Sequence, residues 1–87
     1  MIVVDDPFDA AHDPALPSLR LALDPHEVER RFKRRLPRLA GEDGLVRVRG
    51  IHVVRHKPGR RCLVEYDLRV ERPDRPPELD RLLGKVR

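Results

Sequence analysis

The sequence predicts an α+β fold, in which a small antiparallel sheet is accompanied by one N-terminal amphipathic helix. Two β-patterned runs, residues 45–56 and 62–71, are separated by a short turn that contains Pro58 and Gly59. Apolar residues recur at helical spacing over residues 25–36. A chain of 87 residues makes at most one small domain, so these elements must share one thin core.

The helix over residues 25–36 has the clearest local signals. Asp24 can cap its first turn, Pro25 suits the first helical position, and Glu27 lies three residues after the cap. Pro37 should end the regular helix. One apolar face is formed by residues at intervals of four, namely Val28, Phe32 and Leu36.

The two β-patterned runs differ in regularity. Residues 62–71 alternate cleanly, with apolar side chains at even positions and charged ones at most odd positions, which is typical of a strand with one buried face. Cys62 shares the apolar parity and is expected to be a small core residue. In residues 45–56 the alternation weakens after Gly50, which therefore indicates a β-bulge or a break between two short strands.

The two ends of the chain are less regular. Residues 1–18 read as an irregular, acidic, proline-containing lead-in with room for one short strand. Residues 72–77 are rich in proline and predict a loop. The last segment is ambiguous, because Leu79 to Val86 show helical spacing, whereas Gly84 interrupts it and residues 82–87 would also form a short third strand.

Charge favours anionic partners. The formal net charge is +4, but residues 20–87 hold all 19 basic residues against 11 acidic ones, a local net of +8. Nucleic acid, nucleotide phosphates and acidic protein surfaces are the partners that such a balance attracts. There is no signal-peptide pattern and no apolar stretch near the ~20 residues that span a bilayer, so a cytoplasmic location without membrane contact is expected.

The turn between the two β-runs concentrates this charge. Within residues 55–61, five side chains are cationic or can become so: Arg55, His56, Lys57, Arg60 and Arg61. Gly59 would let the backbone approach an anion, and a phosphate is the ligand that the pattern favours. An ordinary solvated turn is the simpler alternative, because Pro-Gly is common turn chemistry.

A second basic group lies on the predicted helix, where six of the nine residues 30–38 are Arg or Lys. A small nucleic-acid-binding module would show this density. However, Glu27 and Glu29 stand at i, i+4 spacing before Arg31 and Lys33, and few aromatic residues are present for base stacking. The four histidines show no close carboxylate or cysteine pattern, so no metal site is expected.

The segment Val53 to Tyr66 resembles the N-terminal lobe of the aminoglycoside/choline-kinase-like phosphotransferase family. It carries an R-x-K-P-G-R-R-C signature at residues 55–62, and Leu23-Asp24-Pro25 before an amphipathic helix also fits such lobes. The resemblance covers roughly residues 16–87 and implies that residues 19–87 form part of a kinase-like N-lobe. Members of this family transfer the γ-phosphoryl group of ATP to a small-molecule hydroxyl.

The resemblance also implies a nucleotide site. Residues 56–61 take the place of the phosphate-covering loop, and Lys85 falls where the family has the lysine that pairs with the α/β-phosphates. The implied ATP contacts are Lys57, Gly59, Arg60, Arg61 and Lys85. The turn has one glycine and thereby departs from the G-x-G-x-x-G of protein kinases.

The catalytic and magnesium-binding residues of the family lie in a C-lobe that this sequence does not include. No residue of this chain is therefore offered as a catalytic base or as a Mg²⁺ ligand, and the 87 residues alone are expected to be inactive. A truncated reading frame without activity stays open as a further alternative. The phosphoryl acceptor is not indicated.

Overall fold

The computed structural model describes residues 2–35 and 44–87. Its elements, in chain order, are β1 (Val3–Asp5), the 3₁₀ turn η1 (Ala10–His12), α1 (Leu19–Ala22), α2 (Pro25–Arg35), β2 (Leu45–Lys57), β3 (Arg61–Arg72) and β4 (Arg75–Val86). The predicted α+β class, with a mainly antiparallel sheet, is confirmed. No helix within the described residues is long and apolar enough to cross a membrane.

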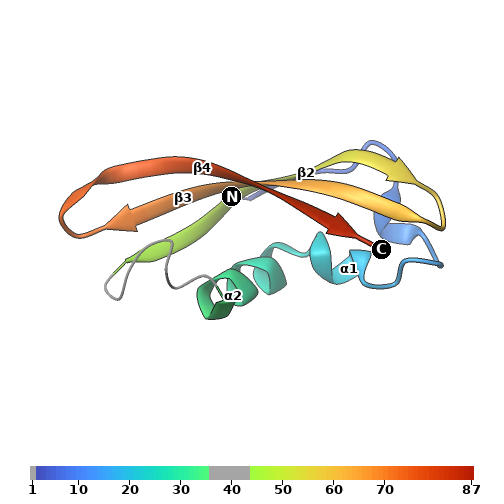
Figure 1. The fold of residues 1–87 in the computed structure, drawn as a ribbon, viewed down its shortest axis with the longest axis horizontal. Coiled ribbons are helices and arrows are strands. Elements are labelled where there is room, and N and C mark those ends of the chain that lie inside the picture. The colour runs from blue at the N-terminus through green and yellow to red at the C-terminus, as the bar shows by residue number, and fades with distance from the viewer. Residues whose placement is uncertain (1, 36–43) are drawn as a thin grey trace.

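The four strands form one sheet in the order β1-β2-β3-β4. β1 runs parallel to β2, whereas the two hairpins β2–β3 and β3–β4 are antiparallel. Figure 1 shows the hairpins as a long twisted ribbon, with α1 and α2 lying along one face. We call the other side the open face; on β3 it carries the odd-numbered residues 63–69, because the even-numbered ones are buried beneath the helices.

Two β-bulges adjust β2 to the core. The register shifts between Val48 and Gly50 and again between Val53 and Arg55, so the predicted irregularity at Gly50 is confirmed. After the first shift Ile51 faces the core, although it follows the core residue Val48 by three positions. The bulges thus explain why β2 does not alternate cleanly in sequence.

β4 corrects the predicted C-terminal region. It begins at Arg75, so the third strand is twelve residues long, and the expected loop at residues 72–77 reduces to a turn at Pro73 and Asp74. The helical alternative is wrong, because residues 75–86 pair with β3 along nearly their whole length. Pro76 and Pro77 are tolerated because β4 is an edge strand, where a missing N–H need not break a ladder.

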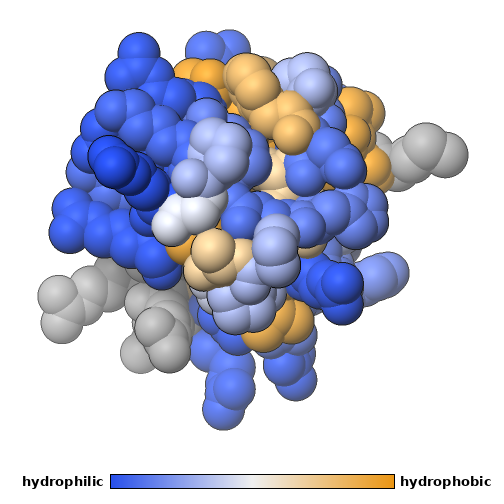
Figure 2. Space-filling model, turned by 90° about the vertical axis from the view of Figure 1, so that its right-hand side faces the viewer, coloured by the Kyte–Doolittle hydropathy of each residue, from blue (hydrophilic) through white to orange (hydrophobic). Residues whose placement is uncertain are grey.

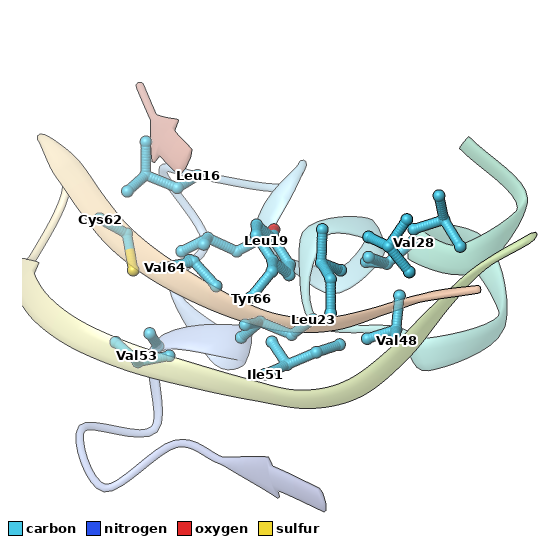
Figure 3. Close-up of a cluster of buried hydrophobic side chains, with 14 residues drawn as sticks. Leu16, Leu19, Leu23, Val28, Val48, Ile51, Val53, Cys62, Val64 and Tyr66 are labelled. Atoms are coloured by element: carbon cyan, nitrogen blue, oxygen red, sulfur yellow. The ribbon is translucent and has the colours of Figure 1, made fainter. Parts of the chain in front are cut away.

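The core lies between the helices and the inner face of the sheet (Figure 3). It is mostly aliphatic and includes Cys62, whose predicted burial is confirmed. Tyr66 adds a polar anchor, since its hydroxyl donates a hydrogen bond to the Ala22 carbonyl at 2.8 Å. Burial raises the pKa of Tyr66 to about 12. The Phe32 ring meets Tyr66 edge to face, with centroids 5.3 Å apart.

The helix α2 starts as the sequence predicts. The backbone N–H groups of His26 and Glu27 donate to Asp24 Oδ1 at 3.0 and 3.2 Å, so Asp24 is its N-cap. The helix is described to Arg35, and the predicted last residue, Leu36, lies outside the described residues. The short helix α1 was not predicted, because a single turn of four residues leaves no periodicity to detect.

Replacing Asp24 with alanine should lower the free energy of unfolding by about 1 kcal/mol, because two N–H groups of α2 lose their acceptor. Urea denaturation followed by circular dichroism measures this loss. Ser18→Ala is a suitable control, since Ser18 precedes α1 without a side-chain capping bond. Equal losses in the two variants would contradict the capping role of Asp24.

Candidate anion site at the hairpin turn

The β2–β3 turn has a defined geometry. The N–H of Arg60 donates to the Lys57 carbonyl at 3.0 Å, which closes a four-residue β-turn. Pro58 is its second residue, and Gly59 is its third, with a φ of 72°. This is the pattern of a type II turn, which needs glycine at the third position because other residues are strained there. The hairpin that Pro58 and Gly59 predict is therefore present.

The inner side of this turn is held by an aspartate from the N-terminal segment. Asp13 Oδ2 accepts the Gly59 N–H at 2.7 Å and lies 2.9 Å from His56 Nε2. We call this group of Asp13, His56 and Gly59 the turn latch. The side chains of His56 and Asp13 are only 7% and 5% exposed. In Figure 1 the blue N-terminal segment lies against this turn at the right-hand end of the molecule.

The turn latch favours the ionised form of Asp13. The Gly59 N–H, followed by the bond to His56, lowers the pKa of this carboxyl below its usual range. The Ala15 N–H donates to the other carboxylate oxygen at 2.9 Å. The sequence predicts that the backbone at Gly59 approaches a phosphate. In the structure, the Gly59 N–H already donates to the Asp13 carboxylate.

The outer side of the same turn collects cations. Lys57 pairs with Arg61, while Leu63 is flanked by Arg55 on β2 and by Lys85 on β4. Because Arg61 and Leu63 have the same parity on β3, all four cations lie on the open face. We call Arg55, Lys57, Arg61 and Lys85 the cation row. Lys57 and Arg61 are directly opposed, so their Cβ atoms lie about 5 Å apart. Arg55 and Lys85 lie on either side of β3, roughly 10 Å apart, a span across which long side chains can reach one ligand.

The cation row forms no ion pair with the described residues. Within residues 2–35 and 44–87, no carboxylate lies at salt-bridge distance from any of its four members. Uncompensated like charges on one face create a positive potential that attracts anions. Figure 2 views the molecule from this end and shows a largely hydrophilic surface with smaller apolar patches. Arg60 is exposed at the tip of the turn, outside the strand pairing.

The basic residues of α2 are arranged differently. Glu27 binds Arg30 and Arg31, at 2.8 and 3.1 Å, and Glu29 lies 3.5 Å from Lys33. Both predicted i, i+4 pairs are therefore present. These pairs neutralise part of the helix charge, which leaves the cation row as the stronger candidate for anion binding.

Sequence reasoning missed the carboxylate partners of three histidines, because His12 pairs with Asp9 and both His52 and His56 pair with distant aspartates. Besides the turn latch, His52 Nε2 lies 3.0 Å from Asp67 Oδ2. The expectation that the histidines lack close carboxylates is therefore wrong. Asp13 is 43 residues from His56, and no local pattern links them. The sequence identifies Asp67 only as one of the charged residues on the solvent-exposed face predicted for residues 62–71.

Comparison with known protein families, with curated proteins and with solved structures returned no match to this chain. Within the described residues, no three His, Cys, Asp or Glu side chains are grouped as a metal site would require. The features that bear on function are therefore the turn, the cation row and the sequence signature at residues 55–62.

Proposed function

We propose that the cation row binds the phosphate groups of ATP, and that this chain serves as the N-lobe part of a small-molecule phosphotransferase in the cytoplasm. The observation that carries the proposal is the register of β3 with its two neighbours. It places Lys85, which is distant in sequence, on the same open face as Arg55 and Arg61, one strand from Arg61 and two strands from Arg55. These residues combine the compact charge of lysine with the bidentate geometry of arginine, both suited to phosphate.

The turn latch supports this arrangement from the opposite side. It fixes the inner side of the turn, so that Lys57 and Arg61 are presented outward from a rigid hairpin end. A phosphate would then meet side-chain cations on the open face and not the Gly59 N–H. This differs from a glycine-rich loop, in which backbone N–H groups contact the phosphates.

The proposed role is limited to nucleotide binding. Phosphoryl transfer depends on positioning and on metal electrostatics, and a Mg²⁺ ion with its ligands would come from a second lobe. The identity of the phosphoryl acceptor would also depend on that lobe. Because the cation row is exposed and screened by salt, binding by this chain alone should be weak and strongest at low ionic strength.

Lys85→Ala should weaken ATP binding about threefold to fivefold, because an exposed charge pair contributes up to roughly 1 kcal/mol. The affinity is measured by NMR titration of the 87-residue chain with ATP at low salt. Lys33→Ala is the matched control, since Lys33 lies on α2 and is paired with Glu29.

An equal loss of ATP affinity in the two lysine variants would show that only net charge matters and would overturn the assignment of Lys85. A single-stranded oligonucleotide that binds more tightly than ATP, with affinity dependent on the α2 cations, would favour the nucleic-acid alternative. Chemical shift changes confined to residues near β3 and β4 at the hairpin end would support the proposal.

A further inference from the structure

A second feature of the open face lies away from the cation row. It is a hollow of about 660 Å³ that crosses all four strands, and its lining includes Val3, Arg49, His52, Asp67, Leu79 and Arg81. Its volume is within the range of small-molecule sites, roughly 300–1,000 Å³. On β4 its Arg81 is four residues from Lys85, a separation of about 13 Å along a strand. The hollow is thus distinct from the proposed phosphate site.

The floor of the hollow is shaped by the first bulge of β2. His52 Nε2 lies 3.0 Å from Asp67 Oδ2, and His52 Nδ1 lies 3.7 Å from Asp5 Oδ2. A Cβ atom at Gly50 would lie only 2.8 Å from His52 Nε2. Glycine at the bulge therefore lets the imidazole lie across position 50 and reach Asp67.

Most charges around the hollow are compensated. Arg81 Nε is 3.4 Å from Asp67 Oδ1, and Asp80 Oδ1 accepts the backbone N–H of Arg81 at 2.8 Å. Arg49 is different, since no carboxylate of the described residues lies within salt-bridge distance of it. Arg49 occupies the bulge itself, and bulges commonly redirect a side chain toward a site.

The two sides of the hollow are apolar and exposed. Val3 on β1 is 57% exposed and Leu79 on β4 is 73% exposed. A ligand that covers them would remove apolar surface from water, which favours binding. The hollow thus offers a guanidinium that has no carboxylate partner among residues 2–35 and 44–87, together with apolar surface.

We propose that this hollow binds a small monocarboxylate with an aromatic or aliphatic body. The carboxylate pairs with Arg49, and the body covers the apolar side chains of Val3 and Leu79. A monoanion suits the site better than a phosphate dianion, because the carboxylates of Asp67 and Asp80 line the same hollow. Arginine binds carboxylates in a bidentate manner, which would orient the ligand.

Titration of the 87-residue chain with 2-naphthoate, followed by ¹H–¹⁵N NMR, tests the proposal. Shift changes should centre on the amides of Gly50, His52, Asp67 and Leu79. Arg49→Gln should weaken binding about fivefold, as expected for loss of an exposed ion pair. Arg47→Gln is the matched control, because Arg47 lies on the same strand outside the hollow and should bind as the wild type does.

Two further measurements separate the charge from the apolar contact. Uncharged 2-naphthamide should bind the wild type about as weakly as 2-naphthoate binds Arg49→Gln, and Leu79→Ala should weaken both ligands. ATP should leave the 2-naphthoate shifts unchanged, so the result does not depend on the phosphate site. Equal effects of the two arginine variants, or shifts centred on Leu63 and Lys85, would overturn the proposal.

Discussion

Replacing Ile51 with alanine should lower the free energy of unfolding by about 2–5 kcal/mol. Ile51 is fully buried on β2, opposite Tyr66, at the point where the sheet meets the helix side of the core (Figure 3). Small domains have a total stability of only about 5–15 kcal/mol, and a thin core is expected to lie at the low end. The variant should therefore populate the unfolded state measurably at room temperature.

Urea denaturation of Ile51→Ala, followed by circular dichroism, gives the loss directly. Val54→Ala is the matched control on the same strand, because Val54 is 50% exposed at the second bulge and should change stability by less than about 0.5 kcal/mol. Ile51→Val should fall between the two, at about 0.5–1.5 kcal/mol. Equal losses at positions 51 and 54 would show that the register of β2 is not the one described.

The elements that sequence predicts well are those whose signals are local. The cap at Asp24, the bulge at Gly50 and the alternation of β3 depend on residues close together in the chain, and the structure contains all three. β4 was predicted too short because its start contains two prolines and its end has helical spacing. Its conformation is decided by pairing with β3, which is a tertiary effect that overrides local preference.

The residues of the candidate site also differ in whether a local sequence pattern identifies them. A sequence signature marks the cations of the turn, and the family resemblance adds Lys85. Strand register places Lys57, Arg61 and Lys85 on one face. Asp13 could not be found in this way, because it belongs to an irregular segment more than 40 residues from its partners. The role of Arg49 could not be predicted from the sequence either, because Arg49 lines the hollow only through the β2 bulge and the neighbouring strands.

Asp13→Asn should destabilise the protein and loosen the hairpin turn. The replacement is isosteric, but it removes the charge that strengthens the bonds from the Gly59 N–H and His56. We expect a melting temperature several degrees lower and faster hydrogen exchange at the Gly59 amide. Asp9→Asn is the matched control, because Asp9 pairs with His12 in an exposed position and should contribute little.

The pH dependence of this effect follows from the lowered pKa of Asp13. A carboxyl whose pKa is lower in the folded state stabilises the fold above its unfolded pKa of about 3.9. The unfolded state binds the proton at a higher pH than the folded state does. The contribution therefore decreases as the pH falls, and it is lost once the pH has fallen through the folded pKa. The stability difference between wild type and Asp13→Asn should thus be full at pH 7 and shrink below about pH 4.

A difference that stays constant down to pH 2 would show that the turn latch does not depend on the Asp13 charge. A shrinking difference would identify this carboxylate as the anion that already occupies the inner side of the turn, leaving its outer cations for a ligand.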